Sequence, residues 1–203
     1  MATPKDQMNA HGLTLLLGNH TEILKLKRKF KPSNHGNKVW DSSWLLIDYL
    51  CRSGAIGYSR VLELGCGWGL TGVYCAKKQG ASVICSDPDE DVQPYLNLIA
   101  KANHTKVDFL NMGIDQIKRN ILKEVDVIIG SDICFCDTMI DPLRRLINRA
   151  KKASVKKILL CDPGRWPFED LAELLEGKKG VALIDWETHT PKEIKGKILE
   201  ICF

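Results

Sequence analysis

The stretch VLELGCGWGLTG, from Val61 to Gly72, places three glycines at alternate positions, Gly65, Gly67 and Gly69. The apolar run before them is typical of a buried strand, and residues 70–80 have the pattern of a helix. Glycines this dense weaken both strands and helices, so the turn needs another reason to contain them. A backbone without Cβ atoms can pass close to a ligand, and the stretch therefore predicts a binding turn between a strand and a helix.

Strands and helices alternate along the chain beyond this turn. The pattern predicts seven strands, at residues 60–65, 81–87, 106–111, 124–132, 155–162, 181–189 and 195–203. Helices are predicted at residues 44–53, 70–80, 89–103, 139–152 and 167–177, with Pro94 tolerated in a first turn. Such alternation indicates an α/β fold with a doubly wound, mostly parallel sheet. Because the last two strands have no helix between them, we expect them to form an antiparallel hairpin at one edge.

The region before these elements gives weaker signals. Residues 13–30 predict two short strands around a turn at Gly18 and Asn19. The lysines and arginine of residues 25–31 fit an exposed edge strand or, alternatively, a site for an anionic partner. Asp41, Ser42 and Ser43 supply N-cap chemistry for the helix that Gly54 closes. We therefore divide the chain into N-terminal strands and a loop that covers the site (1–39) and a single larger domain (40–203).

Composition excludes several classes of protein. The 203 residues are 44% hydrophobic and 27% charged with a net charge of +4, which is typical of one globular domain and mild for a nucleic-acid binder. No apolar run is long enough to span a bilayer, and residues 1–12 lack the layout of a secretory or transit signal. The eight cysteines include no C-x-x-C, which favours free thiols and a cytoplasmic protein. The scattered histidines predict no metal site.

Two carboxylates accompany the glycine turn. Glu63 stands two residues before Gly65, and Asp87 ends the next strand, 22 residues after that glycine. An acid at such a distance can accept hydrogen bonds from both hydroxyls of a ribose. The combination therefore predicts a nucleoside cofactor at the carboxyl ends of the strands.

A dinucleotide is the first alternative for this cofactor. Its fingerprint, G-x-G-x-x-G, would need glycine where Leu70 stands, and Glu63 would add negative charge beside a pyrophosphate. A cofactor with an ammonium and a sulfonium reverses that sign. A second alternative, that the turn is only a tight bend, leaves Glu63 and Asp87 without a purpose.

E-x-G-x-G-x-G after a strand resembles motif I of the class I S-adenosylmethionine-dependent methyltransferases. The resemblance implies a Rossmann-like fold and S-adenosylmethionine as cofactor. It also implies cofactor contacts from Asn111 and Met112 at the adenine, from Ser131 at the end of the fourth strand, and from Trp40, which together with Trp44 precedes the motif. Core packing is the alternative for both tryptophans, and an ordinary loop position is the alternative for Asn111.

The segment Ser131–Asp137 faces the transferable methyl group in such folds. It lacks the proline-rich turn with which many methyltransferases position nucleobase or glutamine amides, and carries Asp-x-x-Phe from Asp132 to Phe135. Together with KVWDSSWLLIDYL, this turn resembles the family-16 protein lysine methyltransferases. KKILLCDPGRWPF is similar to the electron-transfer-flavoprotein β-subunit lysine methyltransferases, and the resemblance runs from about residue 40 to 168. It implies a protein substrate and lysine as the acceptor.

The resemblance also assigns the catalytic residues. Asp132 would hold and aim the acceptor nitrogen, although its side chain could instead cap a helix. A carboxylate with an ordinary pKa near 3.9 is a poor general base, so we expect water to take the proton. Phe135 replaces the family's tyrosine, which leaves arginine or histidine open as acceptors, and it could stack on a cationic side chain. Arg165 faces either a substrate carboxylate or its own loop.

Other functions remain open at this point. An RNA or small-molecule methyltransferase of the same fold is supported only by the basic residues at 25–31 and 151–157. A non-catalytic binding module would not need Glu63, Asp87 and Asp132 together. A dinucleotide reductase would bind nicotinamide. The sequence therefore predicts methyl transfer to a nitrogen of a protein side chain.

Overall fold

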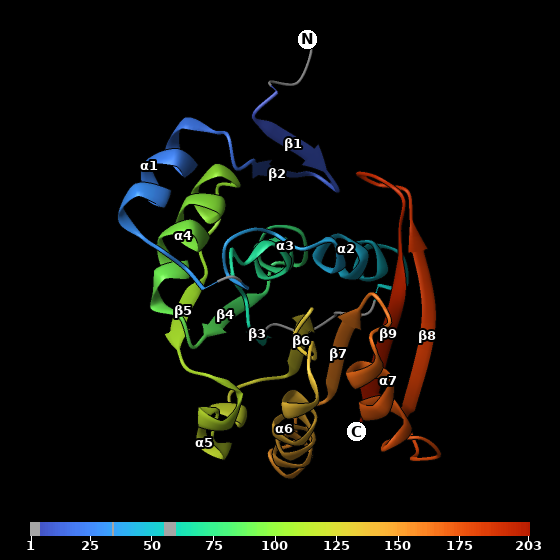
Figure 1. The fold of residues 1–203 in the computed structure, drawn as a ribbon. Helices are drawn as coiled ribbons and strands as arrows, with labels where there is room; N and C mark the ends of the chain where they lie inside the picture. The colour runs from blue at the N-terminus through green and yellow to red at the C-terminus, as the bar shows by residue number, and fades with distance from the viewer. Residues whose placement is uncertain (1–4, 34, 55–59) are drawn as a thin grey trace.

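A computed structural model describes residues 5–33, 35–54 and 60–203 of the chain; residues 1–4, 34 and 55–59 lie outside the described part. Seven strands form one sheet in the order β5-β4-β3-β6-β7-β9-β8 (Figure 1). Their bounds are β3 Arg60–Leu64, β4 Ser82–Asp87, β5 Asp108–Asn111, β6 Val127–Ser131, β7 Lys157–Asp162, β8 Val181–Thr188 and β9 Ile194–Cys202. The predicted seven-stranded, mostly parallel sheet is confirmed.

Helices cover both faces of the sheet (Figure 1). The helices on one face are α2 Asp41–Ser53, α3 Leu70–Gln79 and α4 Gln93–Ala102; those on the other are α5 Arg119–Leu122, α6 Ile140–Lys152 and α7 Trp166–Glu173. Neighbouring residues of the central strand point to opposite faces, so Val61 packs into one apolar core and Leu62 into the other. Each fully buried aliphatic side chain of this kind contributes about 1.5–3 kcal/mol.

The order of the strands indicates where a ligand could bind. β3 pairs in parallel with β4 on one side and with β6 on the other, so that Leu62 lies between Ile84 and Ile128. The chain leaves β3 toward β4 and β5 and then returns to β6 across β3. At such a reversal the connections diverge, and ligands bind beyond the carboxyl ends of the strands. The glycine turn after Leu64 stands at this point.

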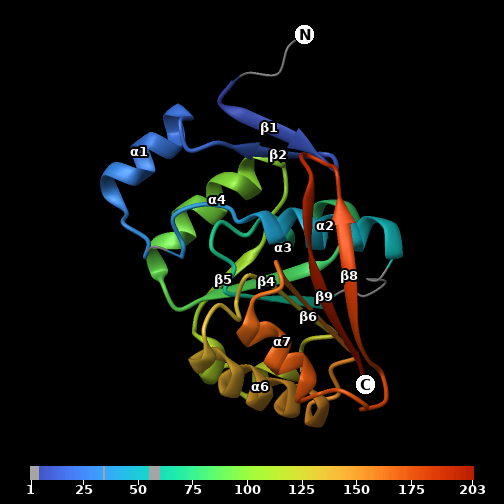
Figure 2. The same ribbon diagram turned by 45° about the vertical axis from the view of Figure 1, so that its right-hand side comes forward.

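The C-terminal strands close one edge of the sheet. β8 and β9 are antiparallel, and β9 is inserted between β7 and β8, with Leu199 opposite both Leu160 and Leu183. Figure 2 shows the two strands side by side. The predicted hairpin is confirmed, and it places β8, rather than the last strand, at the edge.

The N-terminal region corrects one prediction. β1 (Gln7–Ala10) and β2 (Leu13–Leu16) form a small sheet whose turn lies at residues 11–12. The chain does turn at Gly18 and Asn19, where the backbone N–H of His20 donates to the carbonyl of Leu17. The predicted lysine-rich second strand is wrong, because Thr21–Lys29 forms helix α1.

The burial pattern explains why α1 is a helix. Ile23 is fully buried and Leu26 is partly buried, whereas Leu24 is 44% exposed, so the apolar contacts recur at helical spacing. The side chain of His20 caps the first turn by accepting from the backbone N–H of Glu22. Three of the basic residues that suggested an edge strand, Lys27, Arg28 and Lys29, stand in the last turn, where they complement the helix dipole.

Helix α2 differs from its prediction at its start. Gly54 ends the helix in a left-handed conformation, as predicted. Trp40 is the N-cap residue, however, and no side chain caps the first turn. Ser43 instead places its hydroxyl 3.1 Å from that of Ser131 on β6, which ties the helix to the end of that strand.

The eight cysteines are free thiols, as predicted, and five of them are buried: Cys66, Cys75, Cys85, Cys134 and Cys161. No helix within the described residues is long and apolar enough to cross a membrane.

Candidate active site

The glycine turn joins β3 to α3 at the carboxyl end of the central strand. Gly65, Gly67 and Gly69 have φ values of +55°, +51° and +68°, a region that favours glycine. A Cβ at Gly69 would clash with Leu96, and one at Gly65 would crowd Ile133, whereas one at Gly67 would have open space around it. Packing therefore requires the two outer glycines, and the middle one exposes its backbone to the space above the sheet.

A cavity of about 650 Å³ opens over this turn. The ends of β4 and β6, residues around 35–40 and the 3₁₀ turn η2 (Ile114–Gln116) complete its walls. Nine of the predicted site residues line it: Trp40, Gly65, Gly67, Gly69, Asp87, Met112, Ser131, Asp132 and Phe135. Glu63 and Asn111 lie behind the wall. The volume suits a nucleoside-sized ligand with room for a side chain.

Asp87 stands at the end of β4 with both carboxylate oxygens engaged. Oδ2 accepts from the backbone N–H of Gly67 and Oδ1 from that of Asp89, each at a donor–acceptor distance of 3.0 Å. Burial raises the pKa of Asp87, and these two hydrogen bonds oppose the shift. Each oxygen keeps further lone pairs, so the carboxylate can also accept from hydroxyl groups in the cavity.

Glu63 has a different position from the one expected beside a cationic cofactor. It is buried under the turn, where Oε2 accepts from the backbone N–H of Gly72 over 3.0 Å and from the thiol of Cys85. Burial raises the pKa of Glu63 to about 7. Glu63 therefore fixes the first turn of α3 from behind and does not touch the cavity.

Asn111 also acts from behind the wall. Its amide donates to the backbone carbonyls of Asp87 and Pro88, both over 3.1 Å, and the side chain does not line the cavity. Asn111 is the last residue of β5, and it is neither in the cavity wall nor in the ordinary loop position that the sequence left open. Met112, the next residue, does line the cavity.

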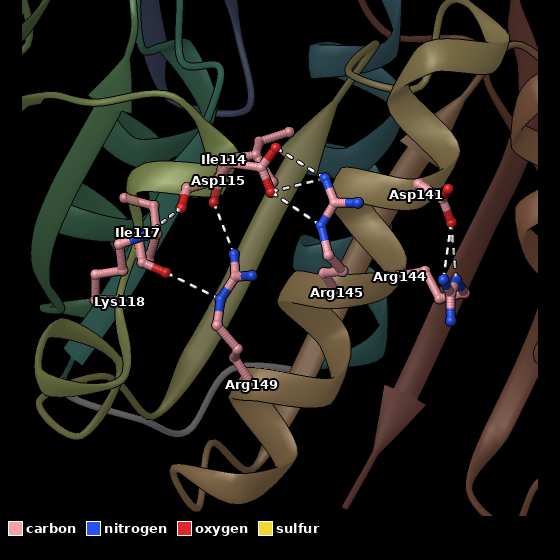
Figure 3. A network of polar contacts seen from close by, with 8 residues as sticks. All are labelled: Ile114, Asp115, Ile117, Lys118, Asp141, Arg144, Arg145 and Arg149. Atoms are coloured by element: carbon pink, nitrogen blue, oxygen red, sulfur yellow. Dashed lines mark hydrogen bonds and ion pairs between the residues drawn. The ribbon is translucent and has the colours of Figure 1, made fainter.

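Helix α6 holds the wall that follows Met112 (Figure 3). Arg149 donates from Nη2 to the carbonyl of Ile114 over 2.9 Å and from Nε to that of Ile117 over 3.1 Å. Arg145 donates to both carboxylate oxygens of Asp115. Ile114 and Asp115 belong to η2, so two arginines of one helix clamp a wall of the cavity. The sequence pattern assigned no role to either arginine.

The segment before α2 covers another side of the cavity. The indole N–H of Trp68 donates to the carbonyl of Gly36 over 3.0 Å, and that of Trp40 donates to the carbonyl of His35 over 2.8 Å. Trp40 lines the cavity, whereas Trp44 is 3% exposed and belongs to the core. The two tryptophans before the glycine motif thus have different roles.

Asp132 lines the part of the cavity that follows β6, whereas Asp87 ends β4, and β3 lies between these two strands. It follows β6 with a φ of +58°, and Oδ1 accepts from Nη2 of Arg165 over 2.6 Å. The same guanidinium donates to both oxygens of Asp162, which is fully buried. Burial raises the pKa of Asp132, and a hydrogen bond with Ser42 and the charge of Arg165 oppose that shift. Arg165 therefore holds two carboxylates of its own chain.

Phe135 completes this end of the cavity. Its ring stacks on that of His35, with centroids 4.2 Å apart and planes inclined by 19°. Both side chains line the cavity. No spacing in the sequence indicated this contact, because it joins two loops 100 residues apart.

Comparisons with known proteins show the family of the chain. Residues 19–169 match the model of a family described as lysine methyltransferase. The chain belongs to this lysine methyltransferase family. It is 33% identical, over 61% of its length, to the protein-lysine N-methyltransferase EFM3 of Chaetomium thermophilum, and 30% identical, over 69%, to a histidine protein methyltransferase 1 homolog of Dictyostelium discoideum. It is 26% identical, over 68%, to the electron transfer flavoprotein beta subunit lysine methyltransferase of Danio rerio.

The chain spans 41%, 49% and 54% of the lengths of these three relatives. Among solved structures, the fold matches a tRNA (uracil-54, C5)-methyltransferase of Pyrococcus abyssi with a TM-score of 0.58 and 15% identity, over 97% of this chain and 45% of that one. A likeness at that identity shows the fold alone.

Proposed function

We propose that this chain transfers the methyl group of S-adenosylmethionine to a nitrogen of a protein side chain, and that this side chain is lysine. The observation that carries the proposal is that the glycine turn and Asp87 line the same cavity as Asp132, Phe135 and Arg165. Membership of the lysine methyltransferase family supports both the reaction and the acceptor.

The residues of the cavity fit the cofactor. Asp87 would accept from the ribose hydroxyls, the open backbone at Gly67 would let the nucleoside approach, and Met112 and Ile114 would contact the adenine. When bound, S-adenosylmethionine supplies an electrophilic methyl carbon on a sulfonium and leaves as a thioether. The fold relative from Pyrococcus abyssi was solved with S-adenosyl-L-homocysteine.

The acceptor end fits an amine. A lysine with an ordinary pKa near 10.4 must lose a proton before its lone pair can attack, and the new C–N bond forms as the C–S bond breaks. Asp132 would hold and aim the nitrogen, Phe135 would border it, and solvent would receive the proton. Positioning in line with the methyl group supplies much of the acceleration in such a displacement. The reaction needs no metal.

We also infer that residues 1–39 act as a covering segment on a methyltransferase domain of residues 40–203, and that the protein works in the cytoplasm. Contacts from the covering segment support this division. The backbone N–H groups of Lys31 and Ser33 donate to Asp91 and Asp89, over 2.8 and 2.6 Å, beside the end of β4. The free thiols fit a reducing compartment.

The basic residues do not favour RNA as the acceptor. Lys157 begins β7, and Lys156 pairs with Asp126, just before β6 begins. Both lysines therefore lie at the amino ends of these strands, whereas Asp132 follows the carboxyl end of β6. The lysines of α1 do not line the cavity.

Labelling tests this proposal. The chain is incubated with tritiated S-adenosylmethionine and a dialysed cell lysate, and labelled polypeptides are hydrolysed to identify the methylated amino acid. We expect methyllysine. Methylhistidine or methylarginine would correct the acceptor, and label in RNA alone would contradict the proposal.

A further inference from the structure

Trp166 is a large apolar side chain that the fold leaves in water. It is 80% exposed, whereas Trp44 and Trp68 are each 3% exposed. A tryptophan can bury more than about 150 Å² of surface on contact, and this residue type is enriched where proteins bind one another most tightly.

The neighbours of Trp166 place it at the acceptor end of the cavity. Arg165, the residue before it, lines the cavity and donates to Asp132 over 2.6 Å. The carbonyl of Pro167, the residue after it, accepts from the thiol of Cys134 over 3.3 Å. Cys134 lies inside the Asp132–Phe135 turn. Contacts on both sides thus bind the backbone of Trp166 to the turn that aims the acceptor.

The backbone of Trp166 is also rigidly held. Oδ1 of the buried Asp162 accepts from the backbone N–H groups of Gly164 and Arg165, over 3.0 and 2.8 Å. Phe168, two residues further, is 1% exposed and anchors the start of α7 in the core. A rigid aromatic side chain with two rotatable bonds loses little conformational entropy on binding.

We propose that Trp166 is a docking residue for the polypeptide substrate and packs against an apolar side chain beside the acceptor residue. This inference rests on the proposed function. Only the acceptor side chain has to reach Asp132, so the backbone that carries it stays outside the cavity, and the exposed Trp166 stands next to Arg165, which lines the cavity. The exposed indole offers an apolar face, and an apolar neighbour of the acceptor gains most from covering it.

The test compares Trp166→Ala with Leu174→Ala. Leu174 is another exposed apolar side chain, 53% exposed, and it stands at the C-terminal end of the helix that Trp166 begins. Initial rates of tritium transfer into gel-resolved polypeptides are measured over a dilution series of dialysed, ribonuclease-treated lysate. Affinity for S-adenosylhomocysteine is measured by calorimetry. For Trp166→Ala we expect the slope at low lysate concentration to fall about tenfold, as for a truncated interface tryptophan, with unchanged cofactor affinity.

The possible results distinguish the docking role of Trp166 from the proposed function. Leu174→Ala should behave as wild type, and the labelled site should have an apolar side chain next to the acceptor. Equal slopes for Trp166→Ala and wild type, or an acceptor with only charged neighbours, would overturn the docking role alone. A wild-type protein that binds S-adenosylhomocysteine but labels no polypeptide would contradict the proposed function itself. Label that enters RNA and no polypeptide, in a parallel lysate left without ribonuclease, would instead make a nucleobase the partner of the indole.

Discussion

Nη2 of Arg165 lies 2.6 Å from Oδ1 of Asp132, and the same guanidinium holds the buried carboxylate of Asp162. One cation thus stands between two carboxylates. This arrangement fixes Asp132 at the cavity and leaves an excess of negative charge there, which favours a cationic side chain as the incoming group. Of the two roles that the sequence leaves open for Arg165, these contacts support the one in which it holds its own loop.

Asp132→Asn keeps the shape of the side chain and removes its charge. We expect methyl transfer to fall at least about a hundredfold, as when an electrostatic contact to a reacting group is lost. Binding of S-adenosylhomocysteine should stay within about twofold of wild type, because Asp87 and the glycine turn hold the nucleoside. Asp137→Asn, a change of an exposed acid in the same loop, is the matched control. Full activity of Asp132→Asn would remove Asp132 from the catalytic residues.

We expect Arg149→Met to weaken cofactor binding, although the side chain of Arg149 would not contact the cofactor. The change removes both hydrogen bonds to the carbonyls around η2, so the wall formed by Ile114 loosens. We expect the Kd of S-adenosylhomocysteine to rise about five- to tenfold, with a smaller effect on the rate at saturating cofactor.

The control for this change lies on the same helix. Arg144 pairs with Asp141 on the side of α6 that faces away from η2, as Figure 3 shows, and both of these side chains are exposed. Arg144→Met should leave the Kd unchanged. An equal loss in both variants would indicate a general effect on α6 and not a clamp on the wall.

Glu63→Gln should change how stability depends on pH. Burial raises the pKa of Glu63 to about 7 from an ordinary value of 4.5, so between these pH values the folded chain keeps a proton that the unfolded chain loses. The wild type therefore loses stability as pH rises through this window, by on the order of 3 kcal/mol.

Glutamine has no proton to lose at this position, and its carbonyl can still accept from Gly72. We expect urea unfolding of Glu63→Gln to show a flatter dependence on pH between 4.5 and 7 than the wild type. Parallel curves for the two proteins would show that Glu63 titrates normally in the folded state.

Much of the fold could be predicted because the local signals agreed. Apolar strands, glycine turns and helices of ordinary length recur from residue 60 onward, and each signal pointed to the same alternation. The prediction of a second N-terminal strand was wrong because Leu24 and Leu26 have the two-residue spacing of a strand. This segment forms helix α1 because of how Ile23 packs, and that packing depends on the tertiary structure.

The site could be predicted where residues stand at the ends of strands, as Asp87 and Asp132 do. Glu63 was predicted beside the cofactor because spacing cannot distinguish the front of a turn from its back. The clamp from Arg149 and the stacking of His35 on Phe135 join segments far apart in the chain. Local sequence patterns do not indicate such contacts.

Calorimetric titration with S-adenosylhomocysteine and, separately, with NAD⁺ tests whether the glycine turn and Asp87 form a site for a sulfur nucleoside. We expect one molecule of S-adenosylhomocysteine to bind per chain, no binding of NAD⁺, and at least about tenfold weaker binding of S-adenosylhomocysteine to Asp87→Ala, which lacks the acceptor for the ribose hydroxyls. Binding of NAD⁺ in place of S-adenosylhomocysteine, or equal affinity of the wild type and Asp87→Ala, would contradict this assignment.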